Sequence, residues 1–253
     1  MDSPLPALNA SVGRLQEMCR GLDDDQLDAP SYCSDWTIAG VLSHLGSAAI
    51  IMQSNLADAL ARRTAPEDFA PSVWDEWNAK SSRSKADDAL VADQGLLEAL
   101  DAVGGADRAR VTFPFGPLTV SFDQAVGFRL NEHVLHSWDI EVVLDNSARL
   151  PPDAAAVVVD NLELITRFAA RPTGEERTVH LRTTGPERNF VLHLTAGGGE
   201  LTPARDRGPE PDLVLPAEAL CRLVYGRLDP EHTPVVDDAE GMLHTLRAVF
   251  PGL

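Results

Sequence analysis

Residues 131–139 read Asn-Glu-His-Val-Leu-His-Ser-Trp-Asp, and this stretch predicts the middle of a long, partly buried helix. Glu132 and His136 are four residues apart, so their side chains project from the same face of that helix. Trp138 and other apolar neighbours favour a buried face over a solvated pair. Asp139 lies three residues after His136 and is expected to orient the ring through its second nitrogen, as metal-bound histidines require.

A second histidine, His44, lies in residues 36–45, which read Trp-Thr-Ile-Ala-Gly-Val-Leu-Ser-His-Leu. It follows Val41 by three residues, on the buried flank of a second predicted helix. Together His44, Glu132 and His136 form a two-histidine, one-carboxylate set, which is typical of a catalytic zinc site with one open coordination position. Spacing alone also allows ordinary core or surface residues, so a helical bundle without a metal stays open as an alternative.

The hydrophobic pattern predicts four helices before residue 150, and such an antiparallel bundle is a usual setting for metal sites between facing helices. The first predicted helix covers residues 5–22, and the second is capped by Thr37 and runs to about Arg62. The third covers 72–103 and is broken or kinked at the polar run 81–85 or at Gly95. The fourth starts from a capping box at Ser121–Gln124 and ends near Leu144. Residues 110–118 are expected to form a loop or a short strand.

The pattern changes at Leu150-Pro151-Pro152. Beyond it we predict a helix over 153–168, strands over 178–184, 190–195 and 212–215, a turn at 197–199, a helix after Pro216 and a last helix over 240–249. The expected fold class is therefore α+β. Residues 1–149 form a four-helix bundle, and residues 150–253 form a small α+β domain.

Composition limits the possible partners. The 253 residues carry a formal net charge of −18, with 39 acidic and 21 basic side chains, which disfavours binding to nucleic acid or to an anionic membrane. No signal peptide or membrane span is recognised, so a soluble, cytoplasmic protein is expected. The three cysteines, Cys19, Cys33 and Cys221, are far apart and disfavour a disulfide framework. Cys33 is a candidate nucleophile, but no low-pKa environment is visible around it in the sequence, so we favour a structural role. Nucleotide-binding motifs and a nucleophile elbow are absent.

Several other polar residues are candidates for substrate binding. Arg129 lies one turn before Glu132 and is expected either to form a salt bridge or to contact a substrate carboxylate. Arg83 belongs to the same class. His133 differs in direction from Glu132 by about 100°, so we expect it on the surface or facing the substrate.

Two motifs suggest a family. Residues 33–45, Cys-Ser-Asp-Trp-Thr-Ile-Ala-Gly-Val-Leu-Ser-His-Leu, resemble a signature of the mycothiol-dependent maleylpyruvate isomerase-like proteins, which are part of the DinB superfamily. The pattern Arg129-x-x-Glu132-x-x-x-His136-x-x-Asp139 resembles that family's second metal motif. Residues 223–227, Leu-Val-Tyr-Gly-Arg, resemble its C-terminal domain more loosely. Gly40 departs from the signature, which has aspartate at that place.

The resemblance implies that His44, Glu132 and His136 bind a divalent metal, usually zinc, and that the thiol cofactor is mycothiol. A thiol bound to a metal is deprotonated at neutral pH and can attack a small electrophile. We favour an S-transferase over a dedicated maleylpyruvate isomerase. A dicarboxylate substrate should require convergent arginines, and only Arg129, Arg83 and Arg227 are candidates. We expect a monomer or a small homo-oligomer.

Two other functions remain open on the same scaffold. One is a non-catalytic protein that binds or sequesters a small molecule. The other is a metal-dependent hydrolase, with a water in the open coordination position. Turnover without any thiol would separate the hydrolase from the thiol-dependent enzyme.

Overall fold

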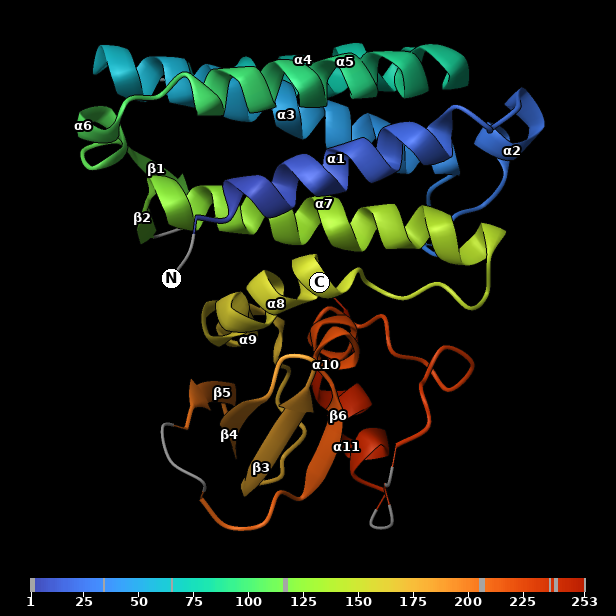
Figure 1. The fold of residues 1–253 in the computed structure, drawn as a ribbon, viewed down its shortest axis with the longest axis vertical. Helices are drawn as coiled ribbons and strands as arrows, with labels where there is room; N and C mark the ends of the chain where they lie inside the picture. The colour runs from blue at the N-terminus through green and yellow to red at the C-terminus, as the bar shows by residue number, and fades with distance from the viewer. Residues whose placement is uncertain are drawn as a thin grey trace. The chain divides into compact units, whose positions relative to one another are not determined.

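The computed structural model describes residues 3–33, 35–64, 66–115, 118–204, 208–236, 238 and 241–252. The chain forms two compact units, residues 1–148 and 149–253, and each is described here by itself. Helices dominate the first unit and a sheet with helices makes up the second, so the predicted α+β class is confirmed (Figure 1). Among the described residues, no helix combines the length and the hydropathy that a membrane span needs.

The first unit is a bundle of four long helices: α1 (Leu5–Cys19), α3 (Ile38–Ala61), α5 (Ser82–Asp101) and α7 (Phe122–Leu144). Helix α1 packs against α5 and α7, and α3 packs against the same two helices, which closes the bundle around one core (Figure 1). That core is made of the apolar stripes that the helical spacing predicts, such as Leu8, Leu45 and Leu130, all fully buried.

Side-chain caps fix where these helices begin. The Thr37 hydroxyl accepts a hydrogen bond from the Gly40 backbone N–H, which starts α3 at the predicted residue. Ser121 and Gln124 form the predicted capping box at the start of α7. Because α3 and α7 carry the histidine–carboxylate set, these two caps set the register of the candidate metal ligands.

The region predicted as one broken helix forms α4 (Phe69–Asn78) and α5 (Ser82–Asp101). The break falls at the polar run, where the Ser81 hydroxyl caps α5. Helix α4 begins before Pro71, which is tolerated in a first turn because its missing N–H has no partner there. No break occurs at Gly95, where α5 continues along α3.

Three short elements complete the first unit. Helix α2 (Asp24–Asp28), not predicted, starts from a capping box at Asp23, and helix α6 (Gly105–Arg108) follows α5. The segment predicted as a loop or a short strand is β1 (Thr112–Phe115), which pairs antiparallel with β2 (Leu118–Ser121).

The second unit begins with α8 (Pro152–Val158), a 3-10 turn η1 (Val159–Asn161) and α9 (Leu162–Ala169), where a single helix is predicted. Strands β3 (Arg177–Thr184), β4 (Arg188–Thr195), β5 (Gly198–Pro203) and β6 (Leu213–Pro216) form a sheet in the order β5-β4-β3-β6. Strand β6 runs parallel to β3, and the other pairs are antiparallel. The predicted turn at 197–199 contains the start of β5, which the sequence did not indicate.

Helices cover one face of this sheet. Helix α9 packs on β5, and α10 (Ala217–Val224) packs on β3 and β6. Alternating residues of β4, namely Phe190, Leu192 and Leu194, are buried, as the period of two predicts. The last helix, α11, covers Met242–Val249, and its predicted first residue, Glu240, lies outside the described residues.

Candidate metal centre

Two helices bring together the histidine–carboxylate set. His44 comes from α3, and Glu132 and His136 come from α7. The Glu132 Oε2 atom lies 3.5 Å from His44 Nε2 and 3.6 Å from His136 Nε2. The candidate ligand atoms of all three residues lie within 4.8 Å of one another. We call these three residues the metal cluster.

The spacing of these atoms fits a cation better than direct hydrogen bonds. Separations of 3.5 and 3.6 Å are long for hydrogen bonds between nitrogen and oxygen. Four ligands about 2.0–2.1 Å from one ion, in a tetrahedron, lie about 3.3 Å from each other. His44 Nε2 is buried and has no hydrogen-bond partner among the described residues, although such an atom is normally satisfied. The chemistry of the cluster therefore fits a divalent metal.

Electrostatics keep the carboxylate of this cluster ionised. Burial alone would raise the pKa of Glu132, but the neighbouring imidazoles of His136 and His44 outweigh burial and lower it. A deprotonated carboxylate is the form that ligates a metal. The side chains of His44 and Glu132 are 32% and 42% exposed, which leaves the cluster accessible to a small molecule.

His136 is oriented by a carboxylate on its own helix. Its Nδ1 atom lies 2.9 Å from Asp139 Oδ2, and the Asp139 side chain is fully buried. In the tautomer in which Nδ1 donates to Asp139, Nε2 carries a lone pair that is available to a metal. The Cys33 thiol donates to the same Asp139 oxygen at 3.0 Å. A chain of contacts thus runs from Cys33 through Asp139 to His136, a link that the sequence did not reveal for Cys33.

The loop before α3 is tied to α7 and closed by a hydrogen bond of its own. The Tyr32 backbone N–H donates to the Asp139 carbonyl at 3.0 Å, and the Ser31 N–H donates to the Trp36 carbonyl at 2.9 Å. These bonds place the Trp36 indole 5.1 Å from the His44 ring and 5.7 Å from the His136 ring, measured between ring centroids. An aromatic wall therefore stands directly beside the metal cluster.

A cavity of about 520 Å³ opens next to this wall. His44 belongs to its lining, together with Trp36, Trp74 and Trp77. Its volume lies in the range of pockets that bind small molecules, about 300–1,000 Å³. Trp74 and Trp77 are three residues apart and share one face of a helix, but the sequence gives no reason to connect them with His44, because the shared cavity depends on tertiary packing.

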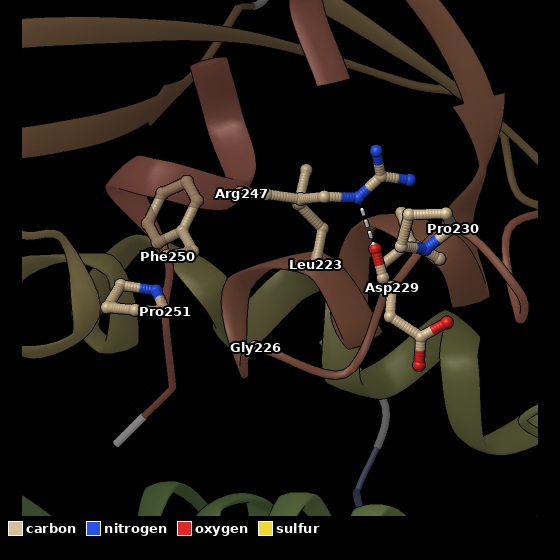
Figure 2. A pocket seen from close by; sticks show the side chains of 8 residues that line it. Leu223, Gly226, Asp229, Pro230, Arg247, Phe250 and Pro251 are labelled. Atoms are coloured by element: carbon tan, nitrogen blue, oxygen red, sulfur yellow. Dashed lines mark hydrogen bonds between the residues drawn. The ribbon is translucent and has the colours of Figure 1, made fainter. Parts of the chain in front are cut away.

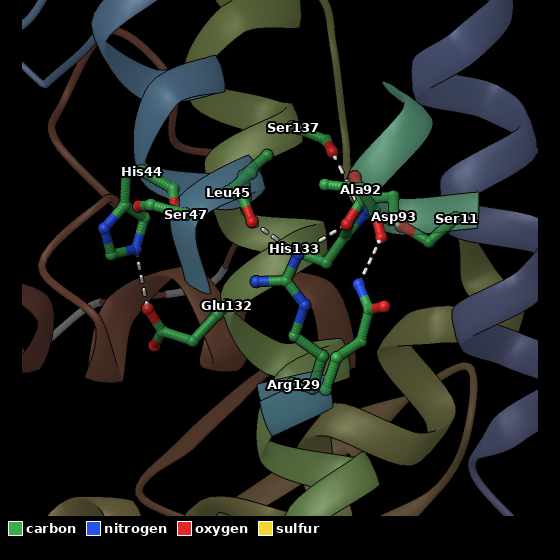
Figure 3. A network of polar contacts seen from close by, with 11 residues as sticks. Ser11, His44, Leu45, Ser47, Ala92, Asp93, Arg129, Glu132, His133 and Ser137 are labelled. Carbon is green, nitrogen blue, oxygen red and sulfur yellow. Dashed lines mark hydrogen bonds and ion pairs between the residues drawn. The ribbon is translucent and has the colours of Figure 1, made fainter. Parts of the chain in front are cut away.

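Two predicted substrate residues lie instead in the bundle core. Arg129 Nη2 donates to Asp93 Oδ1 at 2.6 Å and to the Leu45 carbonyl at 2.8 Å. His133 Nε2 lies 3.2 Å from Asp93 Oδ2, and its Nδ1 lies 2.8 Å from the Ser11 hydroxyl. Figure 3 shows His44 and Glu132 on one side of this view and Asp93 and Ser11 on the other. We call Asp93, Arg129, His133 and Ser11 the buried network.

The expected surface position of His133 is wrong, because its side chain is completely buried. For Arg129 we predicted either a salt bridge or a contact with a substrate carboxylate, and the structure shows the salt bridge. Burial alone would raise the pKa of Asp93, but His133 and Arg129 outweigh it and lower it. Asp93 is an acidic residue on the apolar face of α5, beside Ala89 and Leu96. An acidic residue on an apolar helix face is buried, and a buried carboxylate needs a cationic partner; this was the signal in the sequence for the buried network.

The other two predicted arginines are also engaged. Arg83 donates to Asp24 at 2.8 Å and to the Leu22 carbonyl at 2.9 Å, away from the cavity lining. Arg227 belongs to the second unit, where its Nη1 donates to the Tyr225 carbonyl at 3.0 Å. In the same unit a smaller cavity of about 170 Å³ lies between Arg247 and Phe250 (Figure 2), below the usual size of a ligand pocket.

The remaining cysteines are poor nucleophiles. Burial raises the pKa of the Cys19 thiol to about 12, and burial also raises the pKa of the Cys221 thiol. Both are buried, whereas Cys33 is half-buried. The thiol chemistry that the sequence suggests is therefore not supplied by Cys19 or Cys221.

Comparisons with known proteins agree with the motifs. Residues 8–141 match the family model described as the mycothiol maleylpyruvate isomerase N-terminal domain. A crystal structure of the mycothiol-dependent maleylpyruvate isomerase has a similar fold, with a TM-score of 0.63, 13% identity and coverage of 88% of each chain. A histidine-to-alanine variant of that isomerase also matches, with a TM-score of 0.63, 12% identity and coverage of 93% of this chain and 92% of the other. No curated protein matches in sequence. The resemblance inferred from the two motifs is confirmed.

Proposed function

Because this chain belongs to the mycothiol maleylpyruvate isomerase family, a family of enzymes, we propose that it is a metal-dependent enzyme in which mycothiol attacks a small electrophile. One observation carries the proposal. His44 Nε2, which has no hydrogen-bond partner among the described residues, lies beside Glu132, and the separations of Glu132 from His44 and His136 suit the ligands of one ion. We propose zinc as the metal and the cytoplasm, where small thiols stay reduced, as the compartment.

The residues of the cluster have separate tasks in this proposal. His44, Glu132 and His136 would hold the ion, which supplies positive charge that lowers the pKa of a bound thiol. Glu132 contributes the negative charge of the ligand set. Asp139 engages Nδ1 of the His136 ring, so Nε2, rather than Nδ1, would be the atom that holds the ion. Residues 1–149 would form the metal-binding domain, and residues 150–253 a second domain.

S-transfer is the reaction we favour over isomerisation of a dicarboxylate. A dicarboxylate needs two cationic partners, and Arg129 and Arg83 are occupied by Asp93 and Asp24. In a transfer, the sulfur forms a bond to carbon, the leaving group departs with its electron pair, and the thiol proton passes to solvent. In an isomerisation, the sulfur adds to a double bond and leaves again after rotation. Both reactions need the same nucleophile.

Calorimetric titration of mycothiol into zinc-loaded protein, repeated in two buffers of different ionisation heat, tests the proposal. We expect tight binding with release of about one proton per thiol, as metal capture of a thiolate requires. The same titration with His44→Ala should show neither. Binding of zinc without mycothiol binding would overturn the proposal and favour the hydrolase or the sequestration protein.

A further inference from the structure

The cavity beside His44 is lined in part by aromatic side chains. Three indoles contribute to it: Trp36 from the loop before α3, and Trp74 and Trp77 from α4. Trp77 is buried, whereas Trp36 and Trp74 are 39% and 50% exposed. Large aromatic side chains left this exposed beside a cavity present flat apolar faces to a ligand.

Two glycines make room for these rings. A Cβ at Gly46 would overlap with the Trp77 ring, so the absence of a side chain on α3 lets Trp77 lie against the helix. A Cβ at Gly40 would lie 3.2 Å from Trp36 Cβ, and Gly40 itself lines the cavity. Any larger residue at position 40 would therefore crowd Trp36 and narrow the space in front of His44.

The charges of the lining are few. Lys85 is its one Lys or Arg side chain among the described residues, and it forms no ion pair with them. Asp35 is its acidic residue and would repel a second carboxylate on a ligand. The other lysine, Lys80, is outside the lining and is paired with Glu76 and Asp88. The cavity thus offers one cation and several aromatic faces.

We propose that this cavity binds the electrophilic substrate, and that the substrate is a flat aromatic compound with a single anionic group. The ring would lie against Trp74 and Trp36, with the anionic group at Lys85 and the reacting carbon toward the metal cluster. The inference rests on the proposed function, because only a nucleophile at the cluster makes an adjacent cavity a substrate site. It names the substrate class that the family resemblance leaves open.

Binding of 4-nitrobenzoate, a flat aromatic monoanion that cannot react with a thiol, tests this inference without any turnover. Calorimetry on the metal-free full chain should detect it. We expect Trp74→Ala to weaken binding by about tenfold, because an aromatic pair and its buried area are lost. Trp74→Phe should restore most of the affinity.

The charge has its own matched test. Lys85→Met should weaken binding of 4-nitrobenzoate by about fivefold to tenfold but leave that of uncharged nitrobenzene unchanged. Lys80→Met, which removes the lysine outside the lining, should alter neither. Gly40→Asp should weaken the binding of both 4-nitrobenzoate and nitrobenzene, because it adds bulk and negative charge to the cavity.

Three results would overturn the inference. The first is fumarate, a non-aromatic dicarboxylate, binding as tightly as 4-nitrobenzoate. The second is Trp74→Ala and Lys85→Met leaving the affinity for 4-nitrobenzoate unchanged. The third is competition of mycothiol with 4-nitrobenzoate in the absence of metal, since the cavity would then be the binding site of the thiol and not of the electrophile. Failure of the proposed function is separate: it would appear as loss of proton release in the mycothiol titration while 4-nitrobenzoate still binds.

Discussion

The metal cluster and the buried network use the same residue types for opposite purposes. Adjacent residues of α7 belong to each: Glu132 to the cluster and His133 to the network. Both nitrogens of His133 have partners, in Asp93 and Ser11, and its side chain is fully buried. In the cluster, His44 Nε2 has no hydrogen-bond partner among the described residues, only the 3.5 Å contact with Glu132, and its side chain is a third exposed. A fully buried set of ion pairs stabilises the bundle, whereas a partly exposed set can bind a ligand.

Removing the carboxylate of the buried network should have the largest effect. Asp93→Asn leaves Arg129 buried without its counter-charge, and two of that guanidinium's nitrogens, Nε and Nη1, already lack partners in the described structure. We expect the free energy of unfolding to fall by about 3–5 kcal/mol. Urea denaturation at pH 7 measures it. Glu132→Gln in the metal cluster is the control and should cost less than about 1 kcal/mol in metal-free protein. Equal losses would remove the distinction.

The Asp93 carboxylate should also make the free energy of unfolding depend on pH. The pKa of Asp93 is lower in the folded chain than its ordinary value of 3.8, so its ionised form stabilises the fold. That contribution is complete above pH 3.8 and is lost as the pH falls through the folded pKa. The difference in unfolding free energy between wild type and Asp93→Asn should therefore stay constant above about pH 5 and shrink in stronger acid. A difference that shrinks near neutral pH would contradict this.

A matched pair of histidine substitutions separates the two regions by ligand binding. His44→Ala should lower zinc affinity by more than about 100-fold, because removing a metal ligand costs more than removing a residue that hydrogen-bonds to a ligand. Its metal-free stability should change little. His133→Gln should retain zinc binding and lose stability instead. Zinc content after dialysis and thermal unfolding provide the two readouts, and loss of zinc in His133→Gln would refute the division.

Asp139 connects the buried interior to the metal cluster, and its effect should be intermediate. Asp139→Asn removes the negative charge beside His136 Nδ1 and replaces one carboxylate oxygen with an NH2 donor, which weakens the selection of Nε2 as the ligand atom. We expect zinc affinity to fall by about 10–100-fold in competition with a chelator. Exposed Glu141, on the same helix, provides the control as Glu141→Gln, and an equal loss there would show only a general charge effect.

The smallest effect is expected at Cys33. Its thiol contributes one hydrogen bond to Asp139, so Cys33→Ala should weaken zinc binding by about twofold to tenfold, and Cys33→Ser should restore it. The same chelator competition applies. Complete loss of zinc in Cys33→Ala would make Cys33 a ligand itself, in the alternative group of Cys33, His136 and Asp139.

Local signals predicted much of the fold. The caps at Thr37 and Ser121 are encoded by side chains within three residues of the helix starts, so sequence alone places both helices. Helix α2 was missed because it has only five residues and no apolar repeat. Strand β5 was missed because glycines at its start are typical of a turn, and only pairing with β4 makes them a strand.

The candidate cluster was predictable to the extent that it depends on one helix. Glu132 and His136 follow from a spacing of four, and His44 from its motif. The role of His133 was misjudged because its partners, Asp93 and Ser11, come from other helices, and the direction of a side chain says nothing about what covers it. The aromatic cavity was missed for the same reason, since Trp36 and Trp77 come to line one cavity with His44 only in the packed bundle.

The close approach of Trp77 to Gly46 limits how this scaffold can be adapted to new substrates. The same missing side chain brings Ala89 of α5 near, since a Cβ at Gly46 would lie 2.9 Å from Ala89 Cα. Reshaping that wall therefore requires moving two helices apart. Trp36 and Trp74, which are partly exposed, can vary without disturbing the bundle. Directed evolution for altered selectivity should concentrate its library at positions 36, 40 and 74 and leave position 46 untouched.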